Sequence, residues 1–422
     1  MALNSQRGYD NGVLTRKPPM KRLSPSSVPF TFYLAAAVAI GPLSTDMYLP
    51  TFPQLAEYFS ASAAEVQLTL SIFTFGIGGC QLVYGPLTDR FGRKPVIVVG
   101  LVIYLLASLA CVVAVNIDQL VISRFFQALG ACAAIVVPRA MVRDLFAREQ
   151  AARQLSRMGT IMGLAPAIAP VLGGYIAAFY GWQSVFFVLG LAAFILALVT
   201  IMLVDESHLA KDPNALRPSH ILRNYMSLIR HREFLGYALT GGLCFGGLFS
   251  FISGSPLVLI EVLGVRADNF GYFFGMVVLG YMSGTLLGPK MTQMKGLSAS
   301  VGVGTGICAV GGISMVAAGW AGLNTIPAVV GPMIIYTVGM GVVLPQSQAG
   351  AMAPFPEKAG SASALMGFMM LGFAAFLGFL VAYFYDGTQF AMVYAIGLMG
   401  IGSVAIYLLT VRGSTEEMWD ES

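Results

Sequence analysis

Long apolar stretches, separated by short polar segments, fill most of this chain. About 20 residues of α-helix, each rising 1.5 Å, cross the hydrocarbon core of a bilayer. Twelve stretches are long enough, at approximately residues 30–50, 66–87, 95–115, 120–142, 158–180, 184–204, 234–260, 270–289, 297–320, 326–349, 359–383 and 389–411. The sequence therefore predicts an all-α integral membrane protein with twelve transmembrane helices.

The composition supports a membrane protein over a soluble one. Hydrophobic residues make up 57% of the 422 residues and charged residues only 10%, whereas soluble domains are about one quarter charged. The 49 glycines allow close contact between helices in lipid. A net charge of +4 gives no reason to expect a nucleic-acid partner, so the lipid bilayer is the expected surrounding.

The distribution of Lys and Arg predicts the orientation. Of the 24 Lys and Arg residues, 22 fall in the two tails and in every second connecting segment, which all lie on the same side of the membrane. The exceptions are Arg124, inside a span, and Arg266, in a segment on the opposite side. Basic loops stay in the cytoplasm, so both termini are expected there, and the protein in the bacterial inner membrane. No short apolar region with a cleavage site precedes the first span, and we expect no removable signal peptide.

A polar segment at 205–233 divides the spans six and six. Its apolar residues recur at helical spacing, which predicts a short amphipathic helix on the cytoplasmic face. The predicted organisation is a tail (1–27), a six-helix bundle (28–204), this linker (205–233), a second six-helix bundle (234–411) and a tail (412–422).

The two halves also resemble one another weakly. Gly85-Pro86 ends the second span, and Gly288-Pro289 ends the eighth span, the second of its half. Internal repeats of this kind mark transporters whose substrate site lies between the repeats near the membrane midplane.

The loop after the second span carries the most specific motif. It reads Gly85-Pro86-Leu87-Thr88-Asp89-Arg90-Phe91-Gly92-Arg93-Lys94. This resembles the signature loop of the major facilitator superfamily at every defining position, which implies that superfamily's transporter fold. The resemblance implies a cytoplasmic charge latch formed by Asp89 and Arg93, with Asp144 at the inner end of span four as a candidate partner. The alternative is a basic loop that only fixes orientation.

Two ionisable residues lie inside predicted spans. Asp46 and Arg124 are each four residues from the outer end of their span, a depth of about 6 Å. Each costs about 3 kcal/mol to insert, so function is the default hypothesis. Equal depth permits the two to face each other, and a static buried pair is the alternative.

Asp46 is the best candidate proton carrier by elimination. The histidines, at positions 208, 220 and 231, all fall in the linker, and Glu261 is expected to be a boundary residue at the end of span seven. Burial disfavours a charged carboxylate, whereas a nearby guanidinium favours it. Arrival of a substrate could therefore release the proton.

Two further motifs resemble superfamily patterns. Arg124 followed by Gln127 is similar to a pattern in span four that implies a part for Arg124 in proton coupling. In span five, Pro166, Pro170, Gly173 and Gly174 resemble the motif of drug/proton antiporters, although Ala169 replaces its first glycine. An ordinary kinked helix is the alternative for span five.

The segment Leu43-Ser44-Thr45-Asp46-Met47-Tyr48-Leu49-Pro50 indicates a branch. It resembles the Bcr/CflA branch of drug/proton antiporters, the bicyclomycin- and chloramphenicol-resistance type, as do residues 67–71, 249–251 and 269–273. Some related exporters carry a second acid eight positions before the Asp, where this chain has Val38. The departure favours neutral or zwitterionic substrates and exchange for one proton.

The substrate cavity is harder to predict. Apolar pockets with a few polar groups bind drugs, and our candidates are Tyr33, Gln127, Phe249, Phe274 and Gln346. The five cysteines have no ligand spacing and are expected to pack within spans. We found no phosphate loop, nucleotide motif or metal cluster, so no cofactor is expected besides protons as the coupling ion. The resemblance implies a monomer.

These observations predict a proton-coupled multidrug efflux antiporter that exports small amphiphilic compounds by alternating access. A dedicated exporter of a metabolite such as an amino acid or siderophore is one alternative, and a uniporter or symporter for uptake is another. A membrane enzyme or a sensor is a third, but one buried acid and one base are too few for a catalytic set. We therefore do not expect an enzyme.

Overall fold

The structure is a computed structural model that describes residues 23–25, 27–208 and 211–412. This described part is helical, with no strand, and it contains twelve helical segments long and apolar enough to cross a membrane. The predicted fold class is therefore confirmed. The predicted tails, 1–27 and 412–422, lie almost wholly outside the described residues.

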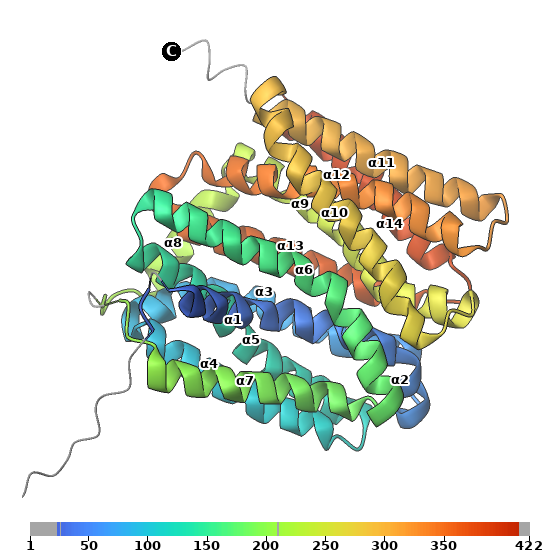
Figure 1. Ribbon diagram of the computed structural model, residues 1–422. Helices are drawn as coiled ribbons and strands as arrows, with labels where there is room; N and C mark the ends of the chain where they lie inside the picture. Colours follow the sequence, from blue (N-terminus) through green and yellow to red (C-terminus); the bar gives the residue numbers. More distant parts are fainter. Residues whose placement is uncertain (1–22, 26, 209–210, 413–422) are drawn as a thin grey trace, which may run out of the picture.

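The helices follow one another in two sets of six spans (Figure 1). The first set comprises α1 (Val28–Asp46), η1 (Leu49–Thr51), α2 (Phe52–Phe59), α3 (Ala63–Phe91), α4 (Arg93–Val112), α5 (Ile117–Leu145), α6 (Arg148–Tyr180) and α7 (Gln183–Leu203). The linker helix α8 (Pro218–Ile229) follows. The second set comprises α9 (Arg232–Ser255), η2 (Pro256–Val262), α10 (Ala267–Lys295), α11 (Leu297–Trp320), α12 (Ile326–Met352), η3 (Pro356–Lys358), α13 (Ala359–Tyr383), α14 (Phe390–Ile406) and η4 (Tyr407–Val411).

The first span is longer than predicted and is interrupted. Helix α1 ends at Asp46, a short 3₁₀ turn follows, and α2 continues to Phe59. Pro50 and Pro53 stand in the first turns of η1 and α2, where a missing N–H costs nothing but the preceding helix cannot continue. The prolines therefore place a break directly after Asp46.

Two helix pairs join the halves: α3 packs against α13, and α6 packs against α10. We call the end with Gly92 and α8 the linker end, and the end with α2 the far end. Helices α6 and α10 meet near the far end, where a Cβ on Gly271 would lie 2.5 Å from the backbone nitrogen of Val171. Toward the linker end the two helices separate (Figure 1).

The linker helix α8 forms where the apolar spacing predicted it. Leu228 is fully buried, and the Tyr225 hydroxyl donates to the carbonyl oxygen of Leu82 on α3 at 2.8 Å. The Lys358 ammonium, from the second half, donates to the Ser227 hydroxyl at 3.2 Å. The linker helix therefore contacts both halves.

Candidate functional site

Asp46 is the last residue of α1, and only 4% of its surface is exposed. Within the described ranges its carboxylate accepts one hydrogen bond, from the Thr45 hydroxyl at 2.9 Å. No Lys or Arg of the described residues forms an ion pair with it. Asp46 is therefore a buried carboxyl group without a cationic partner.

Arg124, on α5, is fully buried. Its guanidinium donates to the carbonyl oxygen of Ser44 at 3.1 Å, to that of Thr69 at 3.4 Å and to Oε1 of Gln127 at 2.6 Å. The Ser44 carbonyl is free to accept because it lies in the last turn of α1, where helical carbonyls lack partners. Arg124 therefore binds the chain at the break in the first span.

Aromatic rings surround the same guanidinium. Its central carbon lies 4.0 Å from the ring centre of Phe73, 4.8 Å from that of Tyr48 and 5.7 Å from that of Phe186. Cations are attracted to ring faces within about 6 Å, by about 2 kcal/mol when water is excluded. The rings and carbonyl oxygens therefore stabilise the charge of Arg124 in place of a carboxylate.

Arg124 donates to the carbonyl oxygen of Ser44, two residues before Asp46, but Asp46 and Arg124 do not form an ion pair. The alternative of a static buried ion pair is therefore not observed among the described residues. The physical reason is that Arg124 finds its partners elsewhere: the backbone of α1 and α3, Gln127 of its own helix, and the surrounding aromatic rings. This leaves the Asp46 carboxyl without a charge of opposite sign.

Gln127, which belongs to the same sequence pattern as Arg124 and is a predicted cavity residue, is fully buried. Its oxygen accepts from Arg124, and its Nε2 donates to the Ser108 hydroxyl of α4 at 2.8 Å. Both the oxygen and the nitrogen of the Gln127 amide are therefore hydrogen-bonded to residues of the first half.

The glycine pair of α6 lies between two other elements. A Cβ on Gly173 would overlap the carbonyl oxygen of Met47, in the break after Asp46. A Cβ on Gly174 would lie 2.9 Å from the carbonyl oxygen of Ala267, where α10 begins. Pro166 and Pro170 are inside the same helix. Helix α6 therefore contacts the Asp46 region with one glycine and the second half with the next.

The structure brings the predicted latch residues together. Arg93 pairs with Asp89 at 2.6 Å and with Asp144 at 2.8 Å, and its Nη1 also donates to the Thr88 hydroxyl at 2.6 Å. These contacts tie the ends of α3, α4 and α5 at the linker end.

The remaining motif residues contact the start of the linker. Arg90 donates to the carbonyl oxygen of Pro213 at 3.3 Å, and Lys94 donates to that of Val204 at 2.7 Å. Gly85 has open space at its Cβ position.

Glu206 is a contact residue that the sequence analysis missed. Its carboxylate accepts from the backbone N–H of Arg93 at 2.9 Å and of Lys94 at 3.1 Å, the first N–H groups of α4. An anion is favourable at a helix N-terminus. Gly92 has φ +100°, and a Cβ there would lie 2.5 Å from the Glu206 carboxylate. Gly92 therefore permits both the positive φ of the turn and the close approach of the Glu206 carboxylate.

The other cavity candidates lie in separate places. The Tyr33 hydroxyl bonds to that of Thr200 on α7 at 2.8 Å, inside the first half. Phe274 stacks on Phe251 at 6.2 Å, and Gln346 donates to Thr292 at 3.3 Å, both inside the second half. Phe249 is buried against Gly378 of α13.

Gln67 of α3 and Phe249 both lie against Gly378 of α13. A Cβ on Gly378 would lie 3.0 Å from Nε2 of Gln67 and 2.9 Å from the Phe249 ring. Gln67 is 1% exposed, and neither amide atom has a hydrogen-bond partner among the described residues. The nearby Ser71 hydroxyl, one turn further along α3, also lacks one. Buried polar groups without partners are rare in proteins, so these two residues join Phe249 as candidates to contact a substrate.

Comparison with known proteins identifies the family. The profile of the Major Facilitator Superfamily matches residues 34–379. A bicyclomycin resistance protein homolog from Haemophilus influenzae is 31% identical, over 91% of this chain and 97% of the relative. Multidrug resistance protein D from Escherichia coli is 29% identical, over 79% of this chain and 83% of the relative. Multidrug resistance protein MdtL from Klebsiella pneumoniae is 28% identical, with the same coverage.

Solved structures share the fold. A bacterial homologue of the human lysosomal transporter Spinster has a TM-score of 0.71 at 14% identity, covering 93% of this chain and 98% of its own. The xylose transporter XylE from Escherichia coli has a TM-score of 0.71 at 13% identity, covering 92% and 98%. The chain is a transporter and not an enzyme by family, and it belongs to the major facilitator superfamily, in its Bcr/CflA-like branch.

Proposed function

We propose that this transporter is a proton-coupled antiporter that exports small amphiphilic compounds, of the bicyclomycin and chloramphenicol kind, by alternating access. The observation that carries the proposal is the state of Asp46, a buried carboxyl group without a cationic partner. An unpaired buried charge is costly, and uptake of a proton removes that charge. The names of the relatives supply the class of cargo.

The geometry supplies a route from the proton to the movement of the halves. Asp46 ends α1, and Met47 beside it contacts Gly173 of α6. The next residue of α6, Gly174, contacts the start of α10 in the other half. A change of charge at Asp46 therefore acts on the same stretch of α6 that closes the far end. Arg124 fixes the break in the first span while this happens.

The linker end would face the cytoplasm, since the basic segments gather there. Helices α6 and α10 contact each other at the far end and separate toward the linker end. In this proposed orientation, in the bacterial inner membrane, the far end would be the periplasmic side, and an arrangement closed at the far end would be inward-facing.

The proton gradient is sufficient for useful export. One proton crossing a potential of roughly 150 mV releases about 3.5 kcal/mol. At about 1.4 kcal/mol per tenfold, this supports a substrate gradient of a few hundred-fold. Exchange of one proton for one neutral or zwitterionic molecule therefore suffices.

The test is reconstitution in liposomes that contain a pH-sensitive dye. Chloramphenicol, bicyclomycin and a lipophilic cation would be applied to the wild type, to Asp46→Asn and to Asp118→Asn. Asp118 is an exposed acid at the start of α5 and serves as the matched control. We expect substrate-induced proton flux in the wild type and in Asp118→Asn, and none in Asp46→Asn. Flux that survives Asp46→Asn would refute the role of Asp46.

The alternatives give different results in the same liposomes. A dedicated metabolite exporter would show no flux with these compounds, and flux with an amino acid or a siderophore. A symporter would move protons in the same direction as its substrate, and a uniporter would move none.

A further inference from the structure

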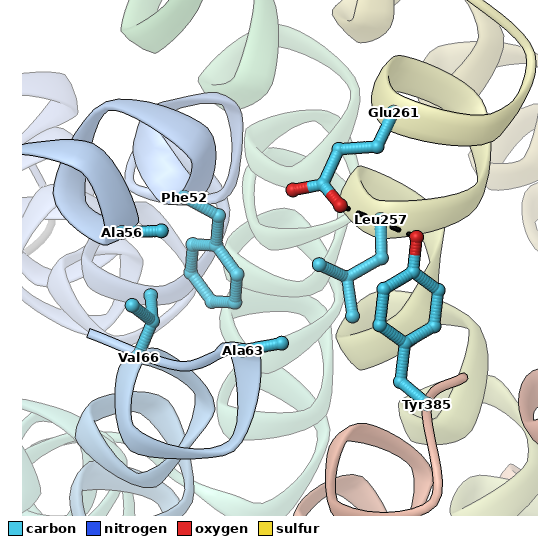
Figure 2. Close-up of a pocket in the computed structure, with 7 residues that line it drawn as sticks. All are labelled: Phe52, Ala56, Ala63, Val66, Leu257, Glu261 and Tyr385. Carbon is cyan, nitrogen blue, oxygen red and sulfur yellow. Dashed lines mark hydrogen bonds between the residues drawn. The ribbon is translucent and has the colours of Figure 1, made fainter. Parts of the chain in front are cut away.

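A cleft at the far end lies between the two halves and is separate from Asp46. It has a volume of about 360 Å³. The wall from the first half is apolar, and the wall from the second half carries a carboxylate and a hydroxyl (Figure 2). The cleft is lined by Phe52, Ala56, Ala63, Val66, Leu257, Glu261 and Tyr385. Pockets that bind small molecules begin at about 300 Å³, so a compact organic molecule fits.

The carboxylate of Glu261 has no cation to balance it. Its one hydrogen-bond partner in the described part of the chain is the Tyr385 hydroxyl, which donates to it at 3.2 Å. Burial, and after it the Glu261 carboxylate, raise the pKa of Tyr385 to about 12, so the hydroxyl stays protonated as the donor. No Lys or Arg of the described residues pairs with Glu261. The cleft therefore presents one negative charge beside an apolar wall.

The surrounding surface has the same sign. The far-end turns and helix ends carry the acids Glu57, Glu65, Asp118, Glu261, Asp268 and Asp386. Among the described residues of this end, Arg266 is the one cation, and it pairs with Asp268 at 2.8 Å. Clefts lined by charge of one sign concentrate ions of the opposite sign, so this end attracts cations and repels anions.

We propose that this cleft is a binding site for a small amphiphilic cation, such as an aromatic quaternary amine, that enters from the far side. The cationic group would lie at the Glu261 carboxylate, and the apolar group would pack against Phe52 and Val66, which are 3% and 1% exposed. The ligand would bridge the two halves, because Phe52 and Val66 belong to the first and Glu261 to the second. Binding would therefore hold the far end closed.

This site goes beyond the proposed export of neutral or zwitterionic compounds, because it needs neither a proton gradient nor transport. A cation bound here would inhibit from outside without being carried. The charge requirement distinguishes the cleft from a purely apolar surface.

Direct binding tests the site. The full chain in uncharged phosphatidylcholine nanodiscs would be titrated by calorimetry with benzyltrimethylammonium, with neutral benzyl alcohol and with anionic phenylacetate. We expect binding of the cation alone. Glu261→Gln should weaken it at least tenfold, whereas Asp118→Asn, which removes the same charge outside the cleft, should change it less than twofold. Ala63→Phe should abolish binding by filling the cleft without changing charge.

Hydrogen exchange locates the ligand independently. The cation should slow amide exchange in residues 52–66 and in 256–263 together. Absence of cation binding, equal binding of benzyl alcohol, or equal weakening by Glu261→Gln and Asp118→Asn would each overturn the proposal. If Glu261→Gln fails to fold, Ala63→Phe and the exchange pattern still decide. None of these results depends on proton coupling, so they do not decide the exporter proposal.

Discussion

Gly173 of α6 packs directly against the carbonyl oxygen of Met47, the residue after Asp46. The contact is so close that no larger residue fits without moving one of the two elements. The helix that joins the two halves at the far end is thus in contact with the backbone beside the candidate proton carrier. In this chain, the first glycine of the pair in the antiporter-like motif allows α6 to contact the backbone of Met47.

Gly173→Ala should therefore separate α6 from the break in the first span. Overpacking costs about 1–3 kcal/mol of stability, and we expect a comparable loss on thermal unfolding in detergent together with at least a tenfold slower substrate-induced proton flux. Gly163→Ala on the same helix is the control, since a Cβ there meets nothing within 4 Å. Equal behaviour of the two variants would show that the contact is unimportant.

Arg124→Lys should be strongly destabilising although the charge is kept. Lysine is a point donor without the planar fork of arginine, so it cannot reach Ser44, Thr69 and Gln127 together. Each buried carbonyl left without a donor costs about 1–3 kcal/mol. We expect a fall in the unfolding temperature of the purified protein and loss of proton flux.

Arg266→Lys is the matched control for this substitution, because the Arg266 side chain is 78% exposed. Exposed ion pairs contribute about 0–1 kcal/mol, so its unfolding temperature should hardly change. A similar small effect at Arg124 would contradict the anchoring role.

The environment of Arg124 shows where sequence reasoning stops. Chain position within two spans predicted a common depth for Asp46 and Arg124, since rise per residue is fixed in a helix. It could not predict how each side chain is directed around its helix axis, and the partners of Arg124 are rings and carbonyl oxygens. The orphaned amide of Gln67 escaped notice for the same reason, because only packing between α3 and α13 leaves it unpaired.

Gly92→Ala should destabilise the loop for two separable reasons. Gly92 has φ +100° and ψ 163°, a region essentially restricted to glycine, and another residue there costs about 1–3 kcal/mol. Its Cβ would also meet the Glu206 carboxylate at 2.5 Å. Glu206→Ala removes the second cost while losing the cap of α4. In a double-mutant cycle on thermal unfolding, the combined variant should lose less stability than the sum of the two single losses.

Additive losses in that cycle would mean that Glu206 does not approach Gly92. The sequence predicted the loop motif and the latch of Asp89, Arg93 and Asp144 because all three residues match a known pattern. It did not reveal Glu206, which lies far from the loop along the chain. Hydropathy likewise predicted the twelve spans, but the proline at position 50 suggested an end that the structure passes, since the first span continues to Phe59.

Impermeant thiol labelling should show the proposed orientation. Ser219→Cys at the linker end and Asp118→Cys at the far end both replace exposed residues. In intact cells with a permeable outer membrane, a membrane-impermeant maleimide should label Asp118→Cys and should label Ser219→Cys only after the inner membrane is opened. The native cysteines give a low background, because four are buried and Cys80 is half-buried. Reversed labelling would invert the assigned sides.

The hydrogen bonds that hold the linker to the first half limit how far the two halves can separate. Asp212 donates its backbone N–H to the carbonyl oxygen of Asp89 at 3.0 Å, and the carbonyl oxygen of Pro213 accepts from Arg90, so the linker is bound to the first half up to Pro213. The helix α8, in contact with α9 and α13, begins at Pro218. The segment between Pro213 and Pro218 reaches about 17 Å when fully extended. It is long enough to follow a rocking motion passively and short enough to prevent the halves from drifting apart in the membrane.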